Sequence, residues 1–572
     1  MSARRLIGME TEYGIHAPSN SRASHVSLSI ELVNAYAAHI TETGGAVAGT
    51  EWDYQSESPL VDARGWVLPR SAAHPSQLTD TSEALSYATE QEAGAGAVRD
   101  ALGNVSGGDP SPADTAERDY HPPGSAHWRG DFYRQKAGQP QLLMNLVLGN
   151  GARFYVDHAH PEYSSPETVG AKRAVLYDVA GDVVARTAAQ RLSREPGTPE
   201  VLLYKNNTDN KSVSYGAHEN YLVPRALPFD SLVTGLLPFF TTRQIICGAG
   251  RVGLGQRSQT PGFQISQRAD FFEEQVGLET TVRRPIINTR DEPHADFDTW
   301  RRLHVIIGDA NMSEYSAWLR VGTTALVLDL IESGKAPAIK LNDPVQALKD
   351  ISHDPTLKCT VATNRGQMTA LQIQHQYLQA VVAHAREVSA PKLPHAAPDT
   401  ETAEIIEAWG DLLMDLDSDV SRAADRVDWV AKKELLDSYR RRDRLEWNSP
   451  QLGMIDLQYH DLRPEKGLYY RLARAGRMRR LFTEEQIDWA ASHPPEETRA
   501  WLRGQLITRH PKSVAGASWD HVLLRPDEVS PVVRLKLTDP FNGNRDQAEH
   551  VLDQAESPAH LASRLQDLLG QR

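Results

Sequence analysis

The fold of this chain is most constrained by an alternation of side chains in NGARFYVDHAHPEYSSPE, residues 150–167. Arg153, Tyr155 and Asp157 alternate there with apolar residues. Successive side chains of a β-strand point to opposite faces of a sheet, so the run predicts a half-buried strand with one polar face. A solvated sheet face and the floor of a binding site both explain that pattern. The chemistry of the neighbouring segments has to decide between them.

Composition excludes several classes of protein. The chain has 572 residues, 40% of them hydrophobic and 24% charged, which is ordinary for a globular protein with more than one domain. A net charge of −14 argues against a dedicated nucleic-acid binder. The two cysteines, Cys247 and Cys359, lack the spacing of a zinc site. No signal peptide and no membrane-spanning run is expected, so the sequence predicts a soluble, cytoplasmic protein.

Periodicity predicts alternating strands and helices along most of the chain. The predicted elements are strands over 5–15, 65–68 and 201–205, and helices over 27–40, 172–192 and 323–333. Residues 69–140 are instead rich in Gly, Ala, Pro and Asp, which predicts a mobile insertion loop beside the site. We expect a large domain over residues 1–430. A smaller C-terminal domain over 431–572 should be mainly helical and contains a strongly basic region.

Two carboxylates in GMETEYG suggest a metal site. Glu10 and Glu12 lie two residues apart on a predicted strand, so both point to one face. Buried carboxylates repel each other, and a bound divalent cation removes that penalty. Glu162, in HPEY, adds a third carboxylate. A solvent-facing strand is the favoured explanation of the Glu10–Glu12 pair alone, so a metal site requires the strands to converge.

Further polar patches are consistent with a shared site. His218 lies in SYGAHENYL, and His304 precedes a strand-like apolar run in RRLHVIIGDAN. Arg268 and Arg290 supply guanidinium groups suited to binding phosphate or carboxylate. The glycine-rich CGAGRVGLG lacks the GK[ST] of a phosphate-binding P-loop. Carboxylates, imidazoles and arginines on separate strands predict a magnesium–nucleotide site on a sheet.

These motifs, in this order, resemble the Pup ligase and deamidase family of carboxylate–amine ligases, which is related to glutamine synthetase. The resemblance extends through GMETEYGI, EWDYQSESPLVDARG, YKNNTDNKSVSYGAHENYL, GFQISQRADF and GTTALVLDLIE. DHAHPEYSSPE and the long loop before it are similar to the deamidase branch. The implied fold is α+β: a glutamine-synthetase-like domain with a curved, mainly antiparallel sheet and helices, plus a small helical C-terminal domain.

The resemblance also implies roles for individual residues. Asp157 matches the catalytic aspartate, as nucleophile or as general base. The expected metal ligands are Glu10, Tyr155 and Glu162, beside Glu12. His218 and His304 are expected as further metal ligands or as nucleotide contacts. The expected ATP contacts are Arg153, Ser165, Arg268 and Trp447, with Arg290 as a substrate contact.

The implied activity is hydrolysis dependent on ATP and Mg²⁺. The enzyme would deamidate the C-terminal Gln of Pup, a prokaryotic ubiquitin-like protein, and cleave the Pup–lysine isopeptide bond, with the nucleotide kept as a cofactor. Expected partners are Pup, pupylated proteins and the proteasomal ATPase, with no nucleic acid and no membrane. The alternatives are a Pup–protein ligase, a ligase of small γ-glutamyl amines, and a Pup-binding adaptor without activity.

Overall fold

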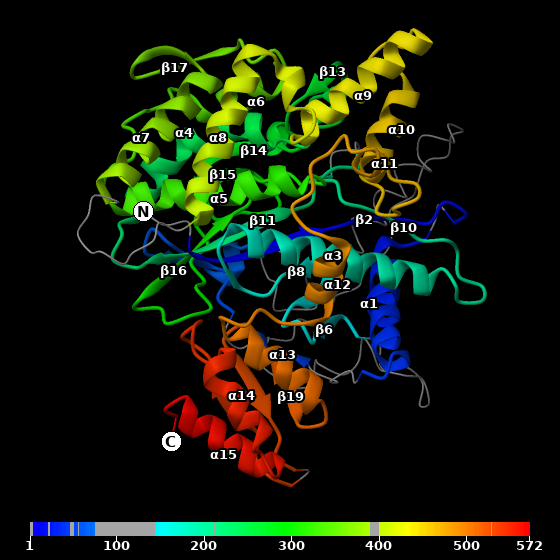
Figure 1. The fold of residues 1–572 in the computed structure, drawn as a ribbon, viewed down its shortest axis with the longest axis vertical. Helices are drawn as coiled ribbons and strands as arrows, with labels where there is room; N and C mark the ends of the chain where they lie inside the picture. Colours follow the sequence, from blue (N-terminus) through cyan, green and yellow to red (C-terminus); the bar gives the residue numbers. More distant parts are fainter. Residues whose placement is uncertain are drawn as a thin grey trace, which may run out of the picture.

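A computed structural model gives the structure of residues 4–20, 23–45, 51–54, 57–74, 143–209, 213–388, 400–527 and 529–571. Figure 1 shows a large body of helices around a central sheet and a smaller lobe at the C-terminal end. Nearly all of the loop predicted at 69–140 lies outside the described residues; within it, residues 69–74 include a short 3-10 helix, Arg70–Ala72. No helix in the described residues combines the length and apolar character that a membrane crossing requires.

The central sheet has seven strands in the order β16-β11-β1-β8-β7-β6, with β9 also paired to β1. All of its pairings are antiparallel. The strands are β1 (Leu6–Glu12), β6 (Asn145–Val147), β7 (Arg153–Asp157), β8 (His160–Ser164), β9 (Thr168–Val169), β11 (Ala217–Pro224) and β16 (Trp300–Val305). The alternating run predicted as a half-buried strand is therefore β7, and a two-residue turn joins it to β8.

Helices cover one face of this sheet and continue around it. In chain order they are α1 (His25–Glu42), α3 (Ala171–Leu192), α4 (Phe229–Cys247), α5 (Glu314–Glu332), α6 (Pro344–Ser352), α7 (Ala370–Val388), α8 (Thr400–Ser418), α9 (Asp428–Asp443), α10 (Pro450–Tyr459), α11 (Leu468–Arg474) and α12 (Glu484–Ser492). Thr11 of β1 donates to Asp178 of α3 at 2.7 Å. Since strand side chains alternate, Glu10 and Glu12 point to the face away from α3.

The predicted helices at 27–40 and 172–192 are confirmed as α1 and α3, and that at 323–333 is the C-terminal half of α5. The strand predicted over 5–15 was wrong in one respect: it is broken at Tyr13, after which β2 (Gly14–His16) pairs with β10 (Leu202–Tyr204). At the break, the Tyr13 backbone N–H donates to the carbonyl of Pro161 at 3.0 Å, and the Tyr13 hydroxyl donates to the buried Asp182 at 2.9 Å.

The C-terminal lobe has a hydrophobic core of its own. Residue 431, the predicted boundary, lies inside α9, whose Trp429 packs in the main core. The separate core extends from Trp501 to Leu565 and includes Trp52. Its elements are β3 (Glu51–Trp52), α13 (Ala500–Arg509), β19 (Val514–Ala517), β20 (His521–Leu524), β21 (Val533–Lys536), α14 (Arg545–Asp553) and α15 (Pro558–Leu568). The lobe thus contains a four-stranded sheet, β21-β20-β19-β3, as well as helices.

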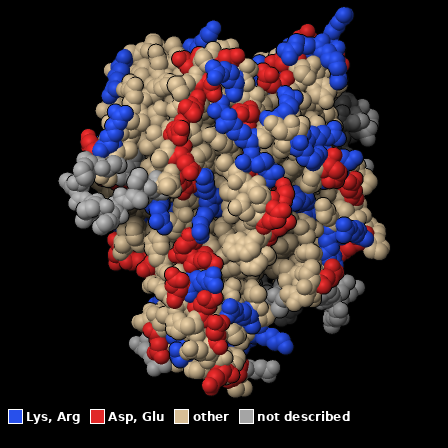
Figure 2. Space-filling view, in the orientation of Figure 1, with Lys and Arg blue, Asp and Glu red and all other residues tan. Residues whose placement is uncertain are grey.

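The remaining strands form two-stranded sheets around the body: β4 (Val61–Asp62) with β5 (Trp66–Val67), β12 (Arg251–Leu254) with β13 (Thr260–Gln264), β14 (Phe272–Gly277) with β15 (Arg284–Asn288), and β17 (Thr360–Thr363) with β18 (Gly366–Thr369). The α+β class and the mainly antiparallel sheet are confirmed. Figure 2 shows acidic and basic side chains interspersed over one face, with basic ones more frequent near α9, α10 and α11. The net negative charge is therefore not gathered into one acidic surface there.

Candidate active site

The register of the central sheet places the predicted polar residues in rows across its uncovered face. Glu12 lies opposite Glu162, and Glu162 lies opposite Tyr155. Glu10 lies opposite His218 in the next row. Directly paired residues of antiparallel strands share a face, so all five side chains point the same way. The convergence of strands that a metal site required is thus present.

One candidate metal group consists of Glu10, His218 and His304, whose ligand atoms all lie within 4.8 Å of one another. His218 Nδ1 is 3.1 Å from Glu10 Oε2. Asn220 connects the group, donating to Glu10 at 2.9 Å and lying 2.9 Å from His304 Nδ1. Burial and the nearby Arg302 keep the pKa of His304 well below its usual value. The His304 imidazole is therefore neutral and able to bind a metal.

The second candidate group consists of Glu12, Asp157 and Glu162, again with ligand atoms within 4.8 Å of one another. Burial, then the charges of Asp157 and Glu10, raise the pKa of Glu162 well above its usual value. Three crowded carboxylates without a cation repel each other, so one of them takes a proton. A cation bound among these carboxylates would remove the repulsion.

The donor atoms of the two groups suit different cations. Three carboxylates form an oxygen set of the kind that Mg²⁺ prefers. Two imidazoles and one carboxylate suit a transition metal such as Mn²⁺ or Zn²⁺ as well as Mg²⁺. The sequence had treated Glu10 and Glu12 as one pair, whereas the structure assigns them to neighbouring groups. Two histidines at the hairpin also contact the second group: His158 lies 2.8 Å from Asp157, and His160 lies 3.4 Å from Glu12.

An open cavity continues along the same face of the sheet beyond Glu10. Its floor includes Leu6, Gly8 and Leu222, and Ser165 lies at its side. A Cβ atom placed on Gly8 would meet nothing within 4 Å, so the cavity reaches the strand backbone. The C-terminal lobe and its approach contribute Arg499 and Trp519 to the lining. The cavity therefore has an apolar floor, an aromatic wall, and a polar end at the candidate metal groups.

Only some of the predicted ATP contacts line this cavity. Ser165 does, and its hydroxyl accepts from the backbone of β1 at 2.9 Å. Arg153 is stacked between Trp52 and Tyr155, with ring centroids 4.0 and 3.8 Å from its guanidinium carbon. Trp447 packs elsewhere, against Phe263, at a ring-centroid separation of 5.8 Å. Trp519, which was not predicted, is an aromatic residue that does line the cavity.

Two neighbouring cations, the buried Arg268 and the half-buried Arg284, lie near the second group. Within the described part of the chain their guanidinium groups donate to carbonyl and hydroxyl oxygens and form no ion pair with a carboxylate. Arg268 donates to the carbonyl of Gly308 at 3.3 Å, and Arg284 donates to the carbonyl of Ser214 at 2.7 Å. Burial, followed by the nearby charge of Arg284, lowers the pKa of Arg268 to about 9, and burial lowers that of Arg284 to about 10. The charge of Glu12 raises both pKa values, so the two cations lie beside the second metal group.

Arg290 lies on the other side of the site. Its charge acts on Glu57, Glu292 and His304. Its Nε is buried and has no hydrogen-bond partner among the described residues. A buried donor without a partner is costly, which suits a residue that meets a ligand.

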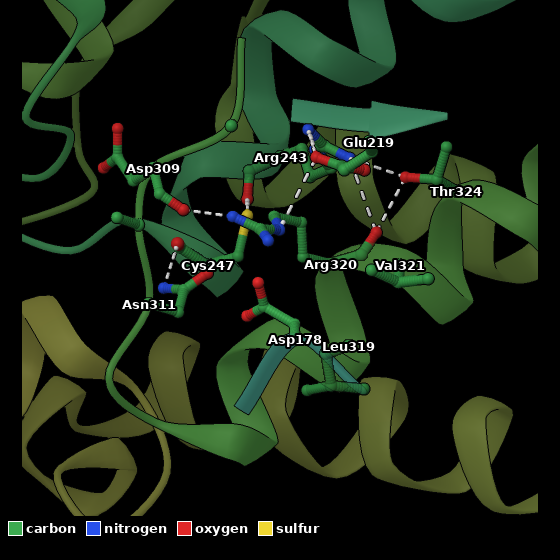
Figure 3. Close-up of polar contacts among 12 residues, drawn as sticks. Asp178, Glu219, Arg243, Cys247, Asp309, Asn311, Leu319, Arg320, Val321 and Thr324 are labelled. Atoms are coloured by element: carbon green, nitrogen blue, oxygen red, sulfur yellow. Dashed lines mark hydrogen bonds and ion pairs between the residues drawn. The ribbon is translucent and has the colours of Figure 1, made fainter. Parts of the chain in front are cut away.

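A buried network supports the site from behind the sheet (Figure 3). Glu219 lies between His218 and Asn220 on β11 and therefore points to the opposite face. It accepts from both terminal nitrogens of Arg243, at 2.8 and 2.9 Å, and Arg320 Nε is 3.5 Å away. Burial alone would raise the pKa of Glu219, but the two arginines lower it. This two-arginine anchor fixes the strand that carries His218 and Asn220.

Comparison with known proteins shows the family. The model of the Pup-ligase protein family matches residues 5–523, most of the chain. The chain belongs to the Pup-ligase protein family. Within the family, the Pup deamidase/depupylase of Mycobacterium tuberculosis is 43% identical over 570 residues, covering 98% of this chain and 99% of that protein. A Pup–protein ligase of Mycobacteroides abscessus is 41% identical over 418 residues, covering 71% of this chain and 90% of the ligase.

Solved structures of the Pup-ligase family agree in fold. The complex between prokaryotic ubiquitin-like protein Pup and its ligase PafA has a TM-score of 0.70 at 29% identity, covering 100% of this chain and 95% of that one. The structure of the ligase PafA in complex with ADP has a TM-score of 0.65 at 34% identity, covering 82% of this chain and 99% of that one. The family resemblance and the glutamine-synthetase-like fold are confirmed.

Sequence reasoning missed two residues of this family member's site. Arg284 follows Arg283 in TVRRPIIN, and only strand alternation distinguishes the inward side chain from the outward one. Trp519 lies far along the chain, in a loop between β19 and β20. Local sequence carries no signal that brings this loop onto the sheet, because the contact arises from the docking of the C-terminal lobe.

Proposed function

We propose that this protein is a Pup deamidase and depupylase, a hydrolase that converts the C-terminal Gln of Pup to Glu and cleaves Pup from substrate lysines. The main support for this proposal is the sequence similarity to a relative of that name over nearly the whole length of the chain. The Mycobacterium tuberculosis relative named Pup deamidase/depupylase matches 98% of this chain, whereas the Mycobacteroides abscessus ligase matches 71%. The sequence DHAHPEYSSPE, which resembles the deamidase branch, forms the hairpin that bears Asp157 and Glu162.

The cavity and its polar end suit an adenine nucleotide with Mg²⁺. The base would lie over Leu6 and Leu222 against Trp519, since ligand pockets are largely apolar with a few convergent polar groups. The phosphates would extend toward the metal groups, where Arg268 and Arg284 supply positive charge. The related ligase PafA was solved in complex with ADP, which supports nucleotide binding on this fold. Bound Mg²⁺ would neutralise the crowded carboxylates and phosphates.

Asp157 is the residue we assign to the chemistry. Its carboxylate ends β7 at the rim of the site and is 29% exposed, so substrate can reach it. Hydrolysis forms a C–O bond at the carboxamide carbon and breaks the C–N bond, releasing ammonia or, from the isopeptide, a lysine amine. Asp157 either accepts the proton of the attacking water or attacks the carbon itself, giving an anhydride that water opens. Tyr155, Glu12 and Glu162 would hold the cation beside it.

Pup is the partner on which this activity depends. A family member, PafA, was solved in complex with Pup, which supports Pup binding on the shared fold. Pupylated proteins are the substrates of the isopeptidase reaction. The proteasomal ATPase is the partner that would consume pupylated proteins and compete for them.

The test is direct. The protein is incubated with Mg²⁺, ATP and Pup ending in Gln, and mass spectrometry follows the replacement of the carboxamide by a carboxylate. A parallel incubation with a pupylated protein follows release of free Pup. The ligase alternative predicts the opposite result: Pup ending in Glu becomes attached to a lysine while ATP is consumed, and Pup ending in Gln is unchanged.

Filling the cavity at Gly8 should weaken nucleotide binding. Its added Cβ meets nothing within 4 Å, so Gly8→Leu should leave the fold intact while its side chain occupies the floor. We expect affinity for ADP with Mg²⁺ to fall at least about tenfold. Titration calorimetry measures the affinity, and Gly453→Leu in α10 is the matched control because its Cβ also meets nothing within 4 Å. Unchanged affinity in Gly8→Leu would place the nucleotide elsewhere.

A further inference from the structure

Glu167 joins the catalytic sheet to the C-terminal lobe. It lies between β8 and β9, and β9 pairs with Leu6 and Ile7 of β1. Its buried carboxylate accepts from Arg499 Nε and from Arg503 at Nη1 (3.2 Å) and Nη2. The backbone carbonyl of Glu167 also accepts from the Thr498 hydroxyl at 2.8 Å. One residue of the sheet thus holds the start of α13.

Arg499 and Arg503 also bind backbone carbonyl groups on the two sides of this junction. Arg503 donates to the carbonyl of Gly151, in the turn before β7, at 3.0 and 2.9 Å. It also donates to the carbonyl of Trp519 at 3.0 Å, and its guanidinium carbon lies 5.0 Å from the centre of the Trp519 ring. Arg499 donates to the carbonyl of Leu537, next to β21. The Glu167 carboxylate therefore holds the Arg499 and Arg503 side chains, and these two side chains in turn hold the C-terminal lobe.

The same residues meet at the cavity. Glu167, Arg499 and Trp519 all line it, whereas Arg503 is fully buried and does not. Trp519 also packs edge-on against Trp52 of β3, with ring centroids 5.2 Å apart. Although burial alone would raise the pKa of Glu167, Arg503 and Arg499 lower it to about 2. The carboxylate is therefore charged at neutral pH and its arginine pairs persist.

We propose that Glu167 is a positioning residue that couples nucleotide binding to the seating of the C-terminal lobe. The inference rests on the proposed nucleotide site. The aromatic wall of the cavity belongs to the lobe, and the floor belongs to the sheet, so a nucleotide between them contacts both. Its affinity depends on the population of molecules in which the lobe is seated, and Glu167 maintains that population. By linkage, a bound nucleotide stabilises the seated lobe by the same factor.

The first test compares Glu167→Gln with the parent protein, using the full chain. Titration with ADP and Mg²⁺ should show about tenfold weaker binding in the variant, within the range of coupling between sites. Glu496→Gln is the matched control, because it breaks another glutamate–arginine pair near the lobe, to Arg545, that is exposed and away from the cavity. Circular dichroism checks that both variants are folded.

Three further measurements separate positioning from general stability. Arg503→Lys keeps the charge, but a lysine cannot reach Glu167, Gly151 and Trp519 at once. This variant should therefore also weaken ADP binding. Because Arg503 does not line the cavity, that effect would be indirect. Hydrogen exchange should show that ADP protects α13 and β20 in the parent and protects them less in Glu167→Gln. Glu167→Asp, which retains the charge, should restore part of the affinity.

The outcomes are distinct. Parent protein that does not bind ADP would contradict the proposed nucleotide site itself. Parent protein that binds ADP, with equal affinity in folded Glu167→Gln and Arg503→Lys, would overturn the coupling while leaving the proposed function intact. Should Glu167→Gln fail to fold, Arg503→Lys and the hydrogen exchange of the parent still decide the question.

Discussion

Asp157→Asn is expected to reduce the rate of Pup deamidation by at least about 10²-fold, because Asn has the same shape but is neither a nucleophile nor a base. The rate of isopeptide cleavage should fall by a similar factor, since both reactions need the same attack at a carbonyl carbon. Steady-state assays with Pup ending in Gln and with a pupylated protein measure the two rates.

Affinity for ADP with Mg²⁺ should fall much less than the rate in this variant. The cavity lies beyond Glu10, and Asp157 does not line it. Asp553→Asn is a suitable control, because that aspartate forms a surface pair with Arg509 on the C-terminal lobe. Near-normal deamidation by Asp157→Asn would remove Asp157 from the chemistry and leave it as a cation ligand beside Glu12 and Glu162.

The two roles of Asp157 differ in where oxygen from water is found. A single turnover in ¹⁸O-labelled water places the label on Pup when Asp157 acts as a base. When Asp157 attacks the carbon directly and water opens the anhydride at the aspartyl carbon, the label is found on Asp157 instead. Peptide mass spectrometry of enzyme and product distinguishes the two routes.

The sequence could predict the sheet face because the alternation of strand side chains is a local rule. Alternation gave the faces of Glu10, Glu12, Tyr155 and Asp157, and the register then placed them in adjacent rows. The sequence could not predict which carboxylates group together. Glu162 lies beside Glu12, and not beside Glu10, because of the register in which β1 pairs with β8. That pairing is a property of the folded sheet.

Local sequence patterns could not predict which distant segments contact each other. Trp447 was predicted beside the nucleotide, whereas the structure packs it against Phe263 and Arg440. Trp519 reaches the cavity because Glu167 holds the lobe through Arg499 and Arg503. From the sequence alone, Trp447 in a basic region and Trp519 in a short loop are equally plausible nucleotide contacts. Only tertiary docking distinguishes them.

Glu162→Gln is expected to weaken Mg²⁺ binding by at least about 100-fold and to abolish activity. Loss of a residue that only supports a metal ligand already lowers metal affinity roughly 10- to 100-fold, and Glu162 is proposed as a ligand itself. Glu10→Gln should do the same to the neighbouring group, because Glu10 is its only carboxylate. Equilibrium binding of Mg²⁺ with ADP, followed by calorimetry, measures both. The control is Glu404→Gln, an exposed glutamate paired to Lys172.

The pH dependence of this binding follows from the crowding of the carboxylates. In the cation-free protein the pKa of Glu162 is well above its usual value, because of burial and then of Asp157 and Glu10. The proton must leave when the cation binds, so Mg²⁺ affinity should fall as pH falls through this raised pKa. Calorimetry in two buffers of different ionisation enthalpy detects the released proton. In Glu162→Gln the release should vanish, because Gln has no proton to lose. Unchanged Mg²⁺ affinity and unchanged proton release in this variant would make the three carboxylates a structural cluster, and the metal would then belong to the group of Glu10, His218 and His304.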